Sequence, residues 1–248
     1  MAAHGYMLHV HYTVDPSNVD EFFKHLRAAL KHVTAEEKCT FFETTVKRDT
    51  GEIRLTEGWA ADLDYLMNVQ IKKDYYKPYF EAIEPLLTKP RVFELFERLP
   101  PEWTTIKASH TADSSFLTST VFKRLPVEVT PSNHHGDTPL HAIYIFLTVN
   151  PSKVDEFLVH LQGLSEHVTA EEKCTFYEIT VKQETGEIRL TEGWAADVDY
   201  LMNVQVKKDY YSPYFEAMGP MMTKPRVVEI FERLPPEWTT VKADHTAQ

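Results

Sequence analysis

The chain has few cysteines and no long apolar run, and both shortages limit the kind of protein it is. Two cysteines in 248 residues, Cys39 and Cys174, cannot form a disulfide framework. A reducing compartment fits them, so we expect a cytoplasmic protein. The most apolar stretch, residues 142–149, is too short to cross a bilayer, and the first five residues lack the basic and apolar regions of a signal peptide. We therefore expect no membrane segment and no secretion signal.

Positive charge and familiar cofactor motifs are also scarce. Lysine and arginine total 26 against 37 acidic residues, which gives a net charge of −11, and no basic block is present. This balance gives no electrostatic basis for binding nucleic acid or anionic lipid. The chain contains no Walker loop and no GxGxxG, GxSxG or HExxH motif. We therefore expect no metal, flavin or haem cofactor.

What the chain does have is globular composition and an internal repeat. Hydrophobic residues make up 43% and charged residues 25%, which excludes a disordered chain. Residues 8–112 align without a gap to residues 143–247, and 76 of the 105 pairs are identical. Two of the longest shared blocks begin at His32 and Thr50. Such similarity indicates that one fold occurs twice.

The segment between the two copies has the composition of a linker, with several serines, prolines, an asparagine and a glycine. We therefore divide the chain into a first repeat at residues 1–112, a linker at 113–138 and a second repeat at 139–248. The length of the linker permits the two repeats to pack against each other.

Each repeat has the pattern strand, helix, hairpin, helix, strand. In the first repeat, an N-capping Asp15 followed by Pro16 opens a helix whose apolar residues lie on one face. The second helix begins near Asp62 and is interrupted around residues 75–78, because a proline at position 78 kinks a helix or begins a new one. The expected strands are residues 7–13, 40–47, 52–59 and 91–96.

The order βαββαβ is the ferredoxin-like split βαβ arrangement. Helices on one face of a four-stranded sheet leave the other face uncovered, and the second repeat can cover it. We therefore expect an α+β fold in which two ferredoxin-like repeats pack as a fused pseudo-dimeric α+β barrel. Further self-association of this intramolecular pseudo-dimer stays open.

The run from Glu57 to Leu66 resembles the end of the third strand and the start of the second helix in antibiotic biosynthesis monooxygenase domains. These domains belong to the dimeric α+β barrel superfamily, and the resemblance covers almost all of each repeat. It implies a pocket between sheet and helices. Several members oxidise aromatic polyketides with O2 without metal or flavin, others degrade haem, and some relatives cyclise or isomerise their substrates.

Many members carry two histidines five residues apart in the second helical region. These positions fall on Gln70 and Tyr75 in the first repeat and on Gln205 and Tyr210 in the second. Because haem degraders use such a histidine to ligate iron, this departure disfavours haem degradation. A tyrosine could replace it only with a lowered phenol pKa.

Helical periodicity independently indicates that Gln70 faces the core. A core-facing amide needs hydrogen-bond partners, which are either backbone groups or a bound substrate. Tyrosines gather at the break in the same helix, where they can present both a ring and a hydroxyl to an aromatic ligand, or pack with the hydroxyls in water. They are Tyr75, Tyr76 and Tyr79, repeated at Tyr210, Tyr211 and Tyr214.

The first strand differs between the repeats. Alternation places His9 and His11 on one face, and Tyr144 and Phe146 at the matching positions of the second repeat. The histidines could bind a metal, act as a base in a pocket, or pack within the sheet, although no third metal ligand is visible. If this face reaches a pocket, only the first repeat offers an imidazole base, and the two repeats are functionally unequal.

On the third strand, Glu57 shares a face with two aliphatic residues and Trp59, and Glu192 and Trp194 repeat the pair. Burial of that face would raise the pKa of the carboxyl and make it a usable base near neutral pH. The alternative is a carboxylate bonded to a neighbouring strand or to an arginine such as Arg54 or Arg91. The tryptophans are expected in the core or in a pocket wall.

These features favour a cofactor-independent monooxygenase that acts on an aromatic, polyketide-like molecule through a deprotonated phenol or enol. Its partners would be a small aromatic substrate and O2. In this hypothesis His9, His11 or Glu57 is the base, and Gln70 and Tyr75 donate hydrogen bonds. The substrate contacts expected in addition are Trp59, Tyr76, Tyr79, Tyr144, Phe146, Glu192, Trp194, Gln205, Tyr210 and Tyr214. The alternatives are a non-oxidative cyclase or isomerase, and a pseudo-dimer that only binds a small ligand.

Overall fold

The computed structural model describes residues 4–111 and 139–246. The predicted linker at 113–138 lies outside the described residues. The strands are β1 (Tyr6–Thr13), β2 (Cys39–Lys47), β3 (Glu52–Trp59), β4 (Val92–Arg98), β5 (Thr104–Ile106), β6 (His141–Thr148), β7 (Cys174–Lys182), β8 (Glu187–Trp194), β9 (Val227–Arg233) and β10 (Thr239–Val241). The α-helices are α1 (Val19–Ala35), α2 (Leu63–Asn68), α3 (Tyr76–Ile83), α4 (Val154–Ala170), α5 (Val198–Asn203) and α6 (Tyr211–Met218).

Local sequence signals account for the helix boundaries. The Asp15 side chain accepts a hydrogen bond from the Ser17 backbone N–H, which caps the 3-10 turn that leads into α1. The second helical region is broken as predicted, but before residues 76–78 rather than within them: a 3-10 turn at Gln70–Lys72 separates α2 from α3. Pro78 lies in the first turn of α3, where its missing N–H costs no intrahelical hydrogen bond.

Within each repeat the four long strands form an antiparallel sheet in the ferredoxin-like order. In the first repeat the order is β2-β3-β1-β4, and in the second it is β7-β8-β6-β9. The register places Leu8 of β1 opposite Glu57 of β3, and Ile143 of β6 opposite Glu192 of β8. The equivalent carboxyls therefore hold equivalent positions in the two sheets.

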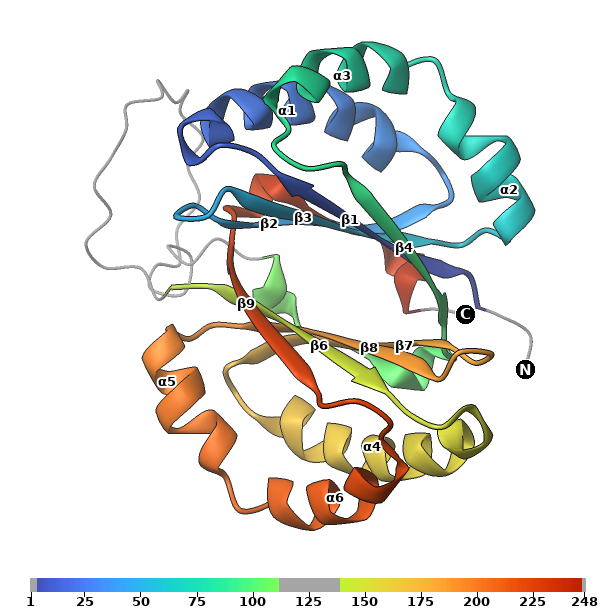
Figure 1. The fold of residues 1–248 in the computed structure, drawn as a ribbon, viewed down its shortest axis with the longest axis vertical. Helices are drawn as coiled ribbons and strands as arrows, with labels where there is room; N and C mark the ends of the chain where they lie inside the picture. The colour runs from blue at the N-terminus through green and yellow to red at the C-terminus, as the bar shows by residue number, and fades with distance from the viewer. Residues whose placement is uncertain (1–3, 112–138, 247–248) are drawn as a thin grey trace.

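The two sheets pack face to face and the helices cover their outer faces (Figure 1). Strand β4 pairs with β7 at one edge and β2 pairs with β9 at the other, so the two sheets join into one ten-stranded system. This arrangement confirms the predicted fold of two ferredoxin-like repeats fused as an α+β barrel. Among residues 4–111 and 139–246, no helix is both long enough and apolar enough to span a membrane.

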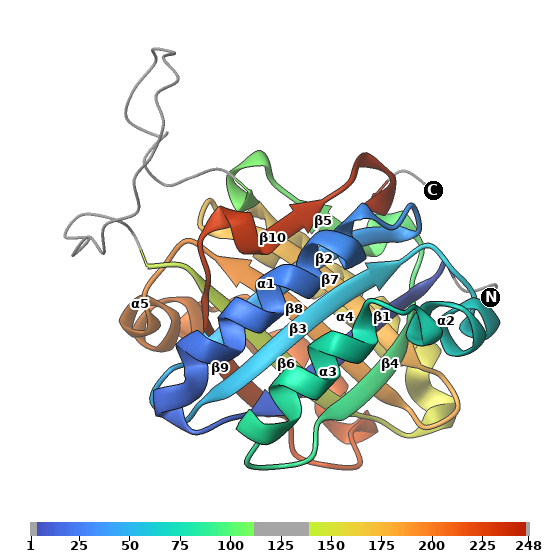
Figure 2. The ribbon, with the colours of Figure 1, turned by 90° about the horizontal axis from the view of Figure 1, so that it is seen from above.

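The repeats also exchange their C-terminal arms, which we define as residues 101–110 and 236–245. Strand β5 of the first arm pairs with β7, and β10 of the second arm pairs with β2, so each arm extends the sheet of the other repeat (Figure 2). Trp238 consequently packs in the hydrophobic core of the first repeat, and Trp103 packs against the core of the second. The sequence does not predict this exchange.

Each arm ends in a buried histidine that joins an ion-pair network between the repeats. His110 from the first arm lies 3.1 Å from a guanidinium nitrogen of Arg233, whose Nε donates to Glu43 at 2.5 Å. The second network is its counterpart, with Arg98, Glu178 and His245. Because all six side chains are buried, these charges depend on one another for stability.

Candidate functional site

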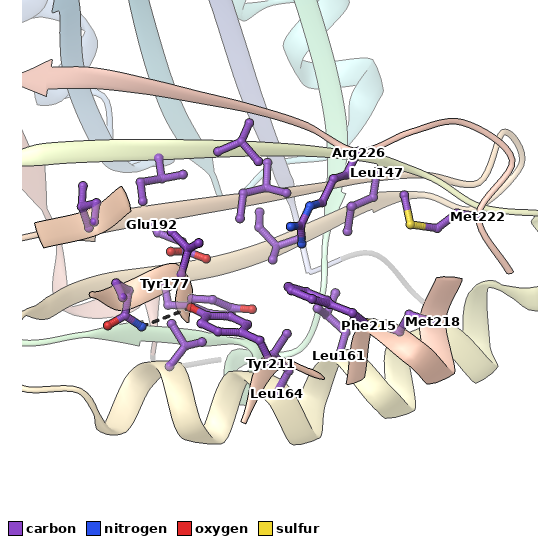
Figure 3. Close-up of a pocket in the computed structure, with 18 of the residues that line it drawn as sticks. Leu147, Leu161, Leu164, Tyr177, Glu192, Tyr211, Phe215, Met218, Met222 and Arg226 are labelled. Atoms are coloured by element: carbon purple, nitrogen blue, oxygen red, sulfur yellow. Dashed lines mark hydrogen bonds between the residues drawn. The ribbon is translucent and has the colours of Figure 1, made fainter. Parts of the chain in front are cut away.

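Each repeat contains an apolar pocket between its sheet and its helices. The first pocket has a cavity volume of about 310 Å³, and the second, at the equivalent place, has about 430 Å³ (Figure 3). Leucine, valine and aromatic side chains from strands and helices form most of both walls. Two cavities of this kind have the size and polarity of sites for small aromatic molecules.

A buried carboxyl lines each pocket. Glu57 and Glu192 are each 5% exposed, and each accepts one hydrogen bond from the indole N–H two residues further along its strand. The distance is 3.0 Å from Trp59 to Glu57 and 2.7 Å from Trp194 to Glu192. Burial raises the pKa of both carboxyls to about 7, although the indole hydrogen bond works in the opposite direction. Each carboxyl can therefore take up and release a proton near neutral pH.

An amide and two phenols lie at the same end of each pocket. In the second repeat the Gln205 Nε2 donates to Tyr210 at 2.6 Å and to Tyr211 at 3.1 Å, and Gln70 makes the same pair of bonds in the first. The periodicity argument correctly placed Gln70 in the interior, where it is 4% exposed. The partners of its amide nitrogen are phenols rather than backbone groups. The amide oxygens of both glutamines have no hydrogen-bond partner among the described residues.

The phenols accept hydrogen bonds from the amide and remain protonated, so each hydroxyl can still donate one. Burial raises the pKa of Tyr210 to about 12 and raises the pKa of Tyr211 further. Tyr211 lines the second pocket and Tyr76 lines the first, whereas Tyr75 and Tyr210 lie beside the pockets and stack on His32 and His167.

Tyr177 is a polar residue of the second pocket that sequence reasoning missed. It belongs to β7, and its hydroxyl is buried without a hydrogen-bond partner among the described residues. The first repeat has Phe42 at the matching position, so it lacks this hydroxyl. Figure 3 shows Tyr177 beside Glu192. Alignment of the two repeats could have found this difference, but not its direction into the pocket.

The first-strand residues predicted as site residues, His9, His11, Tyr144 and Phe146, do not line these pockets. The alternation was correct, but the face with His9 and His11 packs between the two sheets, and the opposite face, with Leu8 and Val10, lines the first pocket. His9 is 1% exposed, contacts the edge of Tyr144, and has a pKa lowered by burial and by nearby Arg189. The expectation that this face opens onto a pocket is therefore wrong.

The remaining three residues of that face join the same inter-sheet layer. His11 pairs with Glu94 at 3.0 Å. The guanidinium of Arg189 lies 3.7 Å from the centre of the Phe146 ring. The Tyr144 hydroxyl is bonded to threonines of the first sheet. None of the three lines either pocket.

The other predicted contacts divide between pocket and core. Trp59 and Tyr79 line the first pocket. Trp194 is fully buried in the core of the second repeat, and Tyr214 packs against α4 at Gly163. In the part of the chain that the structure describes, no group of three or more His, Cys, Asp or Glu side chains has the arrangement of a metal site.

The comparisons with known proteins give a relative and structural neighbours. No family model matches the chain. A protein of Pestalotiopsis microspora named as a candidate monooxygenase is 46% identical over 103 residues, which are 41% of this chain and 86% of that protein. This match has the length of one repeat.

Solved structures match nearly the whole chain. A candidate monooxygenase of Lactobacillus acidophilus NCFM has a TM-score of 0.64 at 14% identity and covers 96% of this chain and 97% of its own. An anthrone oxidase-like protein has a TM-score of 0.59 at 11% identity, with 94% and 92% covered. A candidate antibiotic biosynthesis monooxygenase of Caulobacter crescentus CB15, 28% identical, covers 39% of this chain and 92% of its own, with a TM-score of 0.36. The resemblance to antibiotic biosynthesis monooxygenase domains is confirmed.

Proposed function

Because the chain belongs to the family of the candidate monooxygenase of Pestalotiopsis microspora, we propose that it is a monooxygenase acting on an aromatic, polyketide-like small molecule. In this proposal the substrate itself supplies the electrons for O2, and the protein supplies a base, hydrogen-bond donors and a dry pocket. The names of the relatives support oxygenation in general, and the substrate class and the mechanism are our inference.

The observation that carries the proposal is the buried carboxyl in each pocket. Glu192 has a pKa of about 7, which matches the requirement for a base that accepts a proton at neutral pH. The only other titratable groups that line the second pocket among the described residues are two phenols, whose pKa burial raises, and the guanidinium of Arg226. His9, the leading alternative from the sequence, lies between the sheets.

The proposed chemistry balances without a bound cofactor. The Glu192 carboxylate removes a proton from a phenol or from an activated CH2 group, and the resulting anion is held by the hydroxyls of Tyr177 and Tyr211. The carbanion form reduces O2, and the O–O bond then breaks. One oxygen atom becomes a new carbonyl on the carbon that was CH2, and the other leaves as water with the two protons removed from that carbon. Four electrons pass from carbon to O2.

The apolar walls serve this chemistry in two ways. They favour a flat aromatic ring, and they exclude water, which strengthens the hydrogen bonds to the anion. The same walls keep the carboxyl desolvated and so maintain its raised pKa.

The test is turnover of 1,8-dihydroxyanthrone in air and under argon. We expect the protein to accelerate conversion to the anthraquinone in air, with one O2 consumed per product and no conversion under argon. A variant with both Glu57→Gln and Glu192→Gln is the control for spontaneous oxidation. Conversion to a cyclised or isomerised product under argon would instead indicate the non-oxidative enzyme. Binding without any conversion would indicate a ligand-binding protein, and either result would overturn the proposal.

A further inference from the structure

The two pockets differ most in charge at the side opposite the carboxyl. In the first repeat, Arg91 pairs with Glu84 at 3.1 Å and its guanidinium lies 4.0 Å from the centre of the Phe80 ring. In the second repeat, Arg226 holds the same position over Phe215 at 4.1 Å. The residue that matches Glu84 is a glycine, Gly219, so the second arginine lacks the acidic partner of the first.

The arginine of the second repeat has no substitute partner among the described residues, where no carboxylate lies within 4.0 Å of it. Arg226 is exposed and lines the second pocket. Gly219 has an ordinary helical backbone, and a Cβ added there would meet nothing within 4 Å. The space that Glu84 occupies in the first repeat is therefore open in the second.

The second pocket is also wider along the path to this arginine. Tyr12 and Phe93 line the first pocket, and their counterparts Leu147 and Val228 line the second. Tyr12 packs against Phe22 with ring centres 5.0 Å apart, so its ring fills space that Leu147 leaves free. This replacement of two aromatic rings by aliphatic side chains fits the larger cavity, about 430 Å³ against 310 Å³.

The opposite end of the second pocket is equipped for a hydroxyl group. The unpartnered hydroxyl of Tyr177 and the carboxyl of Glu192 lie together there, while Arg226 lies toward the other end, above the ring of Phe215 (Figure 3). An aromatic ligand between these ends would meet a proton acceptor at one side and a cation at the other.

From this geometry, and resting on the proposed function, we propose that the second pocket selects an aromatic acid. Its phenol or enol faces Glu192 and Tyr177, and its carboxylate pairs with Arg226, which is the residue that determines specificity. The first pocket, where Arg91 lies outside the lining and pairs with Glu84, takes an uncharged aromatic molecule instead. One chain thus carries two related sites for substrates of different charge.

The test measures binding of 6-hydroxy-2-naphthoate and of its methyl ester to the full chain by calorimetry at pH 7.5. The acid has a phenol and a carboxylate at opposite ends, and the ester removes only the charge. We expect one site per chain that binds the acid more tightly than the ester. Arg226→Gln should weaken binding of the acid about tenfold and leave binding of the ester unchanged. A change of this size is what one partly exposed charge-assisted pair contributes.

The internal repeat supplies matched variants. Gly219→Glu rebuilds the ion pair of the first pocket in the second, and should abolish the preference for the acid as Arg226→Gln does. Glu84→Gly releases Arg91 and should create a second acid-preferring site, whereas Arg91→Gln in the unaltered chain should change nothing for the acid. Circular dichroism of each variant verifies the fold.

Binding and turnover separate this inference from the proposed function. Equal affinity for acid and ester, no binding of either, or an acid preference that survives both Arg226→Gln and Gly219→Glu would overturn the inference even if the chain consumes O2. If the acid preference depends on Arg226 but the chain consumes no O2 with any phenol, the inferred selectivity is upheld. The proposed monooxygenase function is then overturned.

Discussion

The two pockets share a buried carboxyl and an amide bonded to two phenols, and they differ in other residues of their walls. Glu57 and Glu192 have the same burial, the same indole partner and the same raised pKa. Differences in the walls include Tyr12/Leu147, Phe42/Tyr177 and Phe93/Val228, and Gly219 of the second wall replaces Glu84, which lies beside the first pocket. The duplicated chain thus keeps the buried carboxyl constant while the shape and charge around it change. Differences in substrate specificity between the repeats should therefore depend on the residues that differ in the pocket walls.

The largest expected effect comes from removing the carboxyl of one pocket at a time. With an aromatic acid as substrate, Glu192→Gln should lower turnover about 10³-fold, because an amide cannot accept the proton. Glu57→Gln should change it less than twofold. In the unaltered chain the rate should rise as pH increases through about 7, since the carboxyl must lose its proton to act as a base. Steady-state rates between pH 5 and 9 measure both effects.

Two results would break the comparison between the pockets. Equal losses in the two single variants would show that the pockets do not divide substrates by charge. A rate with no change between pH 6 and 8 would remove the two glutamates as bases. The control is the neutral methyl ester of the substrate, for which Glu57→Gln should cause the larger loss.

The second prediction concerns the two inter-repeat networks, whose arginine–glutamate distances match at 2.5 and 2.6 Å, while the histidine–glutamate distances are 3.4 and 2.9 Å. Burial alone would raise the pKa of Glu43, but Arg233 and His110 outweigh it and lower the pKa to about 2. Arg233→Met leaves a buried carboxylate without its cation and should lower the free energy of unfolding by about 3 kcal/mol or more. Arg98→Met should cost the same amount, because Glu178 depends on it in the same way.

Urea unfolding at pH 7 measures the two losses. A difference of more than about 1 kcal/mol between the two variants would show that the networks are unequal in stability although their arginine–glutamate distances match. The pH dependence gives a second check. Because the pKa of both carboxyls is lowered in the folded state, their contribution is present above pH 4.5 and is lost as pH falls toward 2.

The sequence predicted the elements better than the contacts between them. Periodicity placed Gln70 in the interior and Glu57 beside Trp59, because both follow from local geometry. The Arg98–Glu178 pair joins residues 80 positions apart, and the exchange of arms also pairs strands of different repeats, so no local pattern encodes either. Alternation also separated the two faces of the first strand correctly. It could not tell which face meets the helices and which meets the other sheet.

The third prediction uses the carboxyls of the pockets as probes of stability. Burial raises the pKa of Glu57 to about 7, so its contribution to stability is present below pH 4.5 and is lost as pH rises through 7. Between pH 5 and pH 8 this carboxyl should lower the free energy of unfolding of the unaltered protein by about 2–3 kcal/mol. Glu57→Gln should remove this part of the decrease. Glu192→Gln should have an equal effect. Urea unfolding at both pH values, with unaltered protein as control, detects it, and an unchanged pH dependence would argue that the carboxyls are hydrated.

The smallest expected effects lie in the layer between the sheets, where the sequence pointed to the largest asymmetry. His9 has no hydrogen-bond partner on either ring nitrogen among the described residues, so His9→Phe removes no bond and should change the free energy of unfolding by less than about 1 kcal/mol. Tyr144→Phe removes a hydroxyl bonded to Thr45 at 3.0 Å and Thr56 at 3.2 Å, and should cost about 1 kcal/mol or slightly more. Neither variant should change turnover more than twofold, because neither side chain lines a pocket. Urea unfolding and steady-state rates test both statements. A large loss of turnover in His9→Phe, with stability intact, would restore the histidine as a base and place the functional difference between the repeats in the first strand rather than in the pocket walls.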